Sequence, residues 1–171
     1  MYRKLAALSI VVVIGLTATA CAKTVAEKII EKQTGGKVKI GTGKNSGSVE
    51  IKGKDGTVRI GENKVPADFP KDVPIYKGAQ VKGSMSSTAN GKKTFIVTLT
   101  TDDALKDAAD YYKKELTSGG WTEKSAMTGG ERGSQFAALG YEKGETLVTV
   151  SMTRVDSDKQ TQMAISVAPK P

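Results

Sequence analysis

The 171-residue chain has no histidine, one cysteine and one tryptophan, and aromatic residues make up 5% of it. Without histidine there is no Ser-His-Asp or Cys-His catalysis and no zinc site built on imidazole. A single cysteine excludes an internal disulfide and a cysteine-rich metal cluster. We therefore expect no metal and no cofactor, and the missing catalytic signatures predict a protein that is not an enzyme.

The first 20 residues have the order of an export signal. Arg3 and Lys4 precede an apolar run over residues 5–16, and small residues fill positions 17–20. This order is typical of a secretory signal peptide. The apolar run, at about 12 residues, is shorter than the roughly 20 that a membrane-spanning helix needs. We assign residues 1–20 to a signal peptide.

The only cysteine, Cys21, directly follows this segment. Ala18-Thr19-Ala20-Cys21 resembles the lipobox of bacterial lipoproteins, with alanine at position 18 where leucine is usual. The resemblance implies a Cys21 that carries acyl chains such as palmitate. It also implies a protein anchored to a bacterial membrane on the extracytoplasmic side of the cell envelope. Cleavage by an ordinary signal peptidase and free secretion is the alternative.

Charge divides the mature chain into two parts. Residues 21–64 carry ten Lys or Arg against five Asp or Glu, whereas residues 65–171 carry 14 against 13. Basic segments beside a lipid anchor attract anionic headgroups and wall polymers. The alternative is that the basic side chains only solvate polar strand faces. A nucleic-acid partner is not expected, because the basic part has no aromatic residue for base stacking. The candidate surface residues are Lys37, Lys39, Lys44, Lys52, Lys54 and Arg59.

The basic part, which we take as an N-terminal segment over residues 21–64, contains a short helical pattern and a repeat. Residues 24–32 have helical periodicity, and Gly35-Gly36 ends it. A Gly-x-Val-x-Ile pattern then occurs three times, over residues 36–40, 47–51 and 56–60. Alternating β-branched residues between glycine-rich turns predict a small three-strand sheet or one turn of a solenoid.

Three prolines mark the boundary of the second part. Pro66, Pro70 and Pro74 stand four residues apart in a segment over residues 65–76, which predicts a stiff connector packed along the domain that follows, residues 77–171. Strand-like runs over residues 80–89 and 92–100 are joined by Asn90-Gly91, a strong hairpin signal.

The rest of this domain alternates between one helix and several strands. Thr100 or Thr101 is the expected helix cap, with acidic residues in the first turn and Gly119-Gly120 at the end. Strands are expected near residues 121–127, 135–141, 145–155 and 160–168. The predicted fold class is α+β: an antiparallel sheet with one main helix packed on one face, preceded by the short helix and the small repeat sheet.

Several motifs of the second part resemble a module of uncharacterised bacterial lipoproteins and secreted proteins. The likeness spans residues 65–167, and it implies location and fold but no activity. The motifs that carry it are Pro74-Ile75-Tyr76-Lys77-Gly78-Ala79, Thr101-Asp102-Asp103, Tyr111-Tyr112-Lys113-Lys114-Glu115-Leu116 and Gly120-Trp121.

These observations favour a non-catalytic, lipid-anchored envelope protein that acts as an interaction or binding module for an unknown protein or polymer. An envelope hydrolase that works through carboxylates is one alternative, because acidic residues cluster at the helix start. A small solute-binding lipoprotein is the other, and an apolar pocket with convergent polar groups would favour it. The carboxylates of the hydrolase hypothesis are those of Asp102, Asp103, Asp107 and Asp110.

Overall fold

The computed structural model describes residues 27–29, 31–32, 36–40, 48–53, 56–61, 63–131 and 133–171. Residues 27–29 and 31–32 are helical, within the short helix expected over residues 24–32. The elements that follow are β1 (Lys37–Ile40), β2 (Val49–Lys52), β3 (Gly56–Ile60), β4 (Gln80–Ala89), β5 (Lys92–Thr101), α2 (Leu105–Ser118), β6 (Thr122–Glu131), β7 (Ser134–Lys143), β8 (Thr146–Val155) and β9 (Thr161–Pro169).

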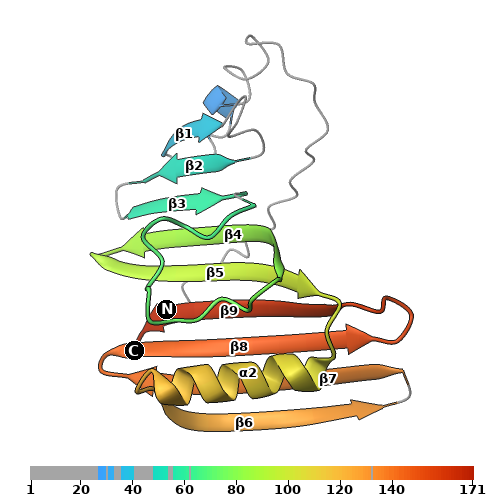
Figure 1. Cartoon of the computed structure of the whole chain (residues 1–171). Helices are drawn as coiled ribbons and strands as arrows, with labels where there is room; N and C mark the ends of the chain where they lie inside the picture. Colours follow the sequence, from blue (N-terminus) through green and yellow to red (C-terminus); the bar gives the residue numbers. More distant parts are fainter. Residues whose placement is uncertain are drawn as a thin grey trace, which may run out of the picture.

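The nine strands in the described part of the chain form one antiparallel sheet in the order β1-β2-β3-β4-β5-β9-β8-β7-β6 (Figure 1). The repeat strands extend the larger sheet, because β3 pairs with the free edge of β4 and satisfies its backbone groups. The expected fold class is therefore confirmed in part. One main helix covers one face of an antiparallel sheet, but the sheet dominates, and the repeat strands are not a sheet of their own.

One face of this sheet, which we call the helix face, is covered by α2 and by residues 65–79 (Figure 1). Phe69 and Val73 of the proline-rich segment are buried, and the Phe69 ring meets Phe95 of β5 edge-on with 5.6 Å between ring centroids. The segment therefore contributes side chains to the same core as the helix. That core includes Val97, Leu99, Leu105, Tyr112, Leu116, Trp121, Leu139, Tyr141, Val150, Met163 and Ile165.

The valine and isoleucine side chains of the repeats share one face of the sheet, as their alternation predicts. Arg59 pairs with Ser86, which pairs with buried Phe95, so these three side chains lie on the helix face. Ile60 and its partner Met85 therefore lie on the opposite, outer face. The remaining apolar repeat pairs are Val38 with Ile51, Ile40 with Val49, Val49 with Ile60 and Ile51 with Val58.

The edge formed by β1 is capped by side chains of the short helix. The backbone N–H of Val38 donates to Glu31 Oε1 at 3.0 Å, and that of Ile40 donates to Glu27 Oε1 at 2.8 Å. The two carboxylates thus accept the hydrogen bonds that a neighbouring strand would otherwise accept. This protects the β1 edge from pairing with a strand of another chain.

The predicted hairpin turn is confirmed, and the predicted helix cap is wrong. Asn90 and Gly91 both have positive φ, 50° and 75°, as the expected turn requires. The N-cap of α2 is Ala104, which has no side-chain hydrogen bond, so neither Thr100 nor Thr101 caps the helix. The Thr101 hydroxyl instead accepts from the Asp103 N–H at 3.3 Å, in an extended stretch that delays the helix to Leu105.

The four expected C-terminal strands correspond to β6–β9. β6 and β7 run longer than expected, because both continue through glycine and serine positions to the tight turn between Glu131 and Ser134.

Candidate functional site

The helix covers the sheet only as far as β7, and β6 projects beyond it. Every residue of β6 is exposed, whereas alternate residues of β7 and β8 are buried beneath α2. The register places Ala126, Thr128 and Gly130 on the helix face, opposite Leu139, Ala137 and Gln135. These three β6 residues are too small to reach the helix, so a gap remains between them and α2.

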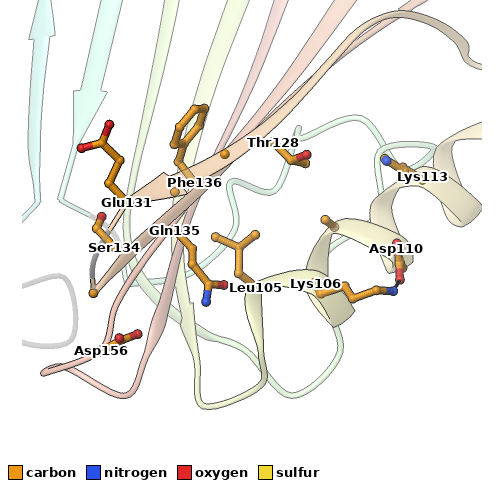
Figure 2. A pocket seen from close by; sticks show the side chains of 14 residues that line it. Leu105, Lys106, Asp110, Lys113, Thr128, Glu131, Ser134, Gln135, Phe136 and Asp156 are labelled. Atoms are coloured by element: carbon orange, nitrogen blue, oxygen red, sulfur yellow. Dashed lines mark hydrogen bonds and ion pairs between the residues drawn. The ribbon is translucent and has the colours of Figure 1, made fainter.

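This gap is a groove of about 580 Å³ between the first two turns of α2 and the β6–β7 hairpin. Figure 2 shows Leu105 and Gln135 directed into it, whereas Phe136 and Glu131 leave the hairpin on the other side. The groove is lined by Leu105, Lys106, Ala109, Asp110, Lys113, Thr128, Gly129, Gly130, Glu131, Gly133, Ser134, Gln135, Phe136 and Asp156.

Charge is unevenly spread along the groove. Lys106 and Lys113 stand on the helix wall with Asp110 between them, and Glu131 and Asp156 stand at the end near the hairpin turn (Figure 2). Lys106 Nζ lies 2.5 Å from Asp110 Oδ2, and this hydrogen bond holds the pKa of Asp110 below its ordinary value. Both side chains of this ion pair are exposed to solvent, so the pair adds little to the stability of α2. Its main effect is that Asp110 offsets one of the two lysine charges on this side of the groove.

On the outer face, behind the same hairpin, three large apolar side chains are exposed. They are Met127, with 61% of its surface accessible, Phe136 with 41% and Val155 with 40%. The Phe136 ring lies over Gly129, where a Cβ atom would come within 2.7 Å of the ring. A larger residue at position 129 would displace the ring from its present place over the strand.

The loop that precedes α2 is fixed by polar contacts from β8 and β9. Arg154 Nη1 donates to the carbonyls of Asp102 and Asp103 at 3.3 and 2.7 Å. The buried Thr161 hydroxyl donates to the Asp103 carbonyl at 2.7 Å, and Gln160 Nε2 donates to Asp102 Oδ1 at 2.9 Å. These contacts hold the helix wall of the groove in place.

Three of the four carboxylates of the hydrolase hypothesis are engaged in separate contacts, and the fourth, Asp107, lies in the first turn of α2. Asp103 accepts from the Tyr76 hydroxyl at 2.9 Å, Asp102 accepts from Gln160, and Asp110 is paired with Lys106. The partners of these three carboxylates come from three different parts of the chain. In the described part of the chain no three His, Cys, Asp or Glu side chains gather as metal ligands would.

The structure brings four of the six predicted surface cations together. Lys37 pairs with Lys52 across β1 and β2, and Lys39 and Arg59 flank Glu50, all on the helix face. Glu50 forms ion pairs with Arg59 at 2.6 Å and with Lys52 at 3.2 Å, so the patch is basic but partly compensated. Lys44, Lys54 and Cys21 lie outside the described residues.

Sequence reasoning missed the groove. Its β6 side consists of Thr128, Gly129 and Gly130, none of which carries a reactive group. The one feature of the sequence that could have indicated it is the pair Gly129-Gly130. Glycine inside a strand often marks a place where another group approaches the backbone closely.

One family comparison bears on this site. A START domain-like family matches residues 81–164, which run from β4 to β9 and include α2 and the whole groove. No curated protein and no solved structure matches the chain significantly. Within the described residues, no helix has both the length and the apolar character needed to span a bilayer.

Proposed function

We propose that this chain is a non-catalytic binding module of the bacterial cell envelope, held at a membrane by lipidated Cys21, which takes its ligand in the groove between α2 and β6. The observation that carries the binding role is the groove itself, with a fixed helix wall and an uncovered floor. The START domain-like match supports it, because that family resemblance suggests a ligand-binding fold.

The two ends of the sheet suit two tasks. β1 and β6 are the outermost strands, eight strand spacings apart, which is about 38 Å at the usual spacing. The anchor cysteine lies close in sequence to Glu27, whose side chain accepts from Ile40 of β1, since five residues separate Cys21 from Glu27 and the six steps span at most about 20 Å. The anchored end would face anionic headgroups or wall polymer, and the groove would face away from them.

Lipidation is tested by labelling cells with an alkyne analogue of palmitate. We expect the full chain to incorporate the label and to fractionate with membranes, and Cys21→Ser to lose both properties. Two or more acyl chains give stable anchoring, so partition should be nearly complete. Label-free, soluble wild-type protein would contradict the proposal.

The basic patch is tested on residues 22–171 with vesicles that contain anionic lipid and, separately, with isolated wall polymer. We expect binding that weakens steeply as salt rises. Changing Lys37, Lys39 and Lys52 to Gln should weaken it by more than tenfold, at about 1 kcal/mol per basic side chain. The matched control changes Lys77, Lys92 and Lys114, which lie elsewhere, and should have little effect. Equal losses in the two triple variants would show that only net charge matters.

The groove is tested by titrating the isotope-labelled chain with a lysophospholipid, a peptidoglycan fragment mixture and a pool of random decapeptides. We expect one probe class to shift the amide signals of Leu105, Thr128 and Gly130. Absence of groove shifts with all three would overturn the binding role.

A further inference from the structure

The two edges of the sheet are treated differently. Glu27 and Glu31 occupy the backbone donors of β1, whereas among the described residues no strand or side chain covers the outer edge of β6. β6 is ten residues long with a register shift between Glu123 and Ser125, and its edge is regular and open from Ser125 to Glu131, whereas long open edges are usually blunted. The open edge also runs along the groove.

The backbone groups on this edge are set by the hairpin turn. Glu131 pairs with Ser134 across a two-residue turn, so that pair is hydrogen-bonded, and so are alternate pairs along β6. The intervening residues, Ala126, Thr128 and Gly130, direct their N–H and C=O groups away from β7. Three donors and three acceptors therefore stand in a row beside the groove.

The surfaces on either side of the edge have different chemistry. On the helix face, Lys106 and Lys113 flank Asp110, so the α2 side of the groove carries one net positive charge, whereas Glu131 and Asp156 make its hairpin end acidic. On the outer face, Met127 and Phe136 present exposed apolar surface. Successive side chains of an added strand would point alternately toward these two surfaces.

We infer that β6 accepts an extended peptide segment of a partner protein as a tenth strand, with acidic side chains toward the lysines of α2 and apolar side chains over Met127 and Phe136. This inference rests on the proposed binding role of the groove and names its ligand. Main-chain hydrogen bonds supply the affinity, and the alternating side chains supply the specificity.

A second copy of the chain suits the edge less well. Two copies joined through β6 by a two-fold axis normal to the sheet would place their lysine-bearing walls on the same face, on both sides of the junction. Like charges would then oppose each other, whereas an acidic peptide would neutralise them.

The test uses the full chain and a displayed library of random decapeptides. We expect enriched peptides to alternate acidic and apolar residues and to bind in a 1:1 complex that weakens with salt. In the complex, hydrogen exchange should slow at the Ala126, Thr128 and Gly130 amides, while the Ser125 and Met127 amides, already bonded to β7, change little.

Thr128→Pro removes one outward donor without breaking the β6–β7 ladder, since proline is tolerated where the N–H faces solvent. It should lower peptide affinity more than tenfold, whereas Thr128→Ala, which keeps the N–H, should stay within threefold. Circular dichroism and urea midpoints confirm that both variants fold. If Thr128→Pro itself unfolds, the exchange pattern of the wild-type complex decides.

Three outcomes would overturn the inference. Peptide binding unaffected by Thr128→Pro would place the peptide elsewhere. Dimers lost in Thr128→Pro would make the second copy the occupant. Groove shifts produced by lysophospholipid or peptidoglycan fragments but not by peptides would preserve the proposed function and refute the strand-addition mode.

Discussion

Trp121 connects three parts of the chain at the end of α2. Its indole Nε1 donates to the Asp72 carbonyl at 3.1 Å, and Lys143 Nζ lies 5.7 Å from its ring centroid. Lys143 also donates to Asp72 Oδ2 at 2.9 Å and to the Gly119 carbonyl at 3.0 Å. The buried ring therefore fixes the proline-rich segment against the helix end.

We expect Trp121→Phe to destabilise the fold by about 1–3 kcal/mol, because the Asp72 carbonyl loses its donor and the core loses ring volume. The control Lys143→Gln, which removes only exposed contacts, should cost less than about 1 kcal/mol. Urea unfolding followed by circular dichroism measures both. A larger loss in Lys143→Gln than in Trp121→Phe would contradict this account.

Two buried tyrosines, Tyr112 and Tyr141, and the half-buried Tyr76 predict a loss of stability in alkali. Burial and a hydrogen bond to the Asp103 carboxylate raise the pKa of Tyr76 to about 12. Burial and a hydrogen bond to the Glu123 carboxylate raise the pKa of Tyr141 to about 12. Burial also raises the pKa of Tyr112.

The sign of the effect follows from proton linkage. Unfolded tyrosines ionise near pH 10, and the folded ones keep their protons to about pH 12. The folded state therefore holds its full advantage below pH 10 and loses it as pH rises from 10 toward 12. Urea midpoints across this range should fall, and Tyr76→Phe should flatten the decline. A midpoint that stays constant to pH 12 would show that these phenols are not protected.

At the scale of elements, α2 ends in a defined glycine motif. The N–H of Gly120 donates to the Thr117 carbonyl, and that of Trp121 donates to the Leu116 carbonyl, both at 3.0 Å. This 5→2 and 6→1 pattern is a Schellman motif, and it requires the positive φ of 79° at Gly120.

Gly120→Ala should cost about 1 kcal/mol, because alanine is strained at that φ although its Cβ atom would meet nothing. Ser118→Ala, at an exposed helical position, is the control and should change stability by less than about 0.5 kcal/mol. Chemical denaturation measures both variants, and equal effects would argue against a strained cap.

The caps on β1 make a second prediction at this scale. Replacing Glu27 and Glu31 by Ala should speed amide exchange at Val38 and Ile40 by about tenfold, since each N–H loses a charge-assisted acceptor. Amides of β8, in the middle of the sheet, serve as internal control. Unchanged exchange at β1 would mean that the carboxylates do not protect this edge.

Sequence patterns of a few residues predicted most helices and strands. They failed where contacts between residues far apart in the sequence determine the structure. The repeats and Asn90-Gly91 could be read because alternation and turn chemistry act over a few residues. The helix start could not, since the hydroxyl of Thr101 is used before the helix and contacts from Arg154 hold the loop extended. The groove was not predicted either, because the Gly129-Gly130 pair marks it only indirectly and its volume depends on how far α2 extends over the sheet.

At the scale of the molecule, one sheet joins the basic strands β1–β3 to the domain over residues 65–171. The stability of each part in the absence of the other can therefore be asked. The apolar core begins at Val65, and no residue of β1–β3 belongs to it. Those strands attach through five cross-strand pairs between β3 and β4, at roughly 0.2–1 kcal/mol each. Residues 65–171 should therefore fold alone, with stability reduced by about 1–5 kcal/mol.

The same argument predicts that residues 22–64 do not fold alone, because Val38 is the only side chain of β1–β3 that is buried, which is too small a core for an isolated three-strand sheet. Trp121 fluorescence and circular dichroism in urea test the two fragments separately. A cooperative transition in residues 65–171 with none in residues 22–64 would mean that the basic strands form on a preformed β4 edge. A fragment 65–171 without a cooperative transition would show instead that the nine strands are one folding unit. Truncation would then disturb the groove at the far end of the sheet as well.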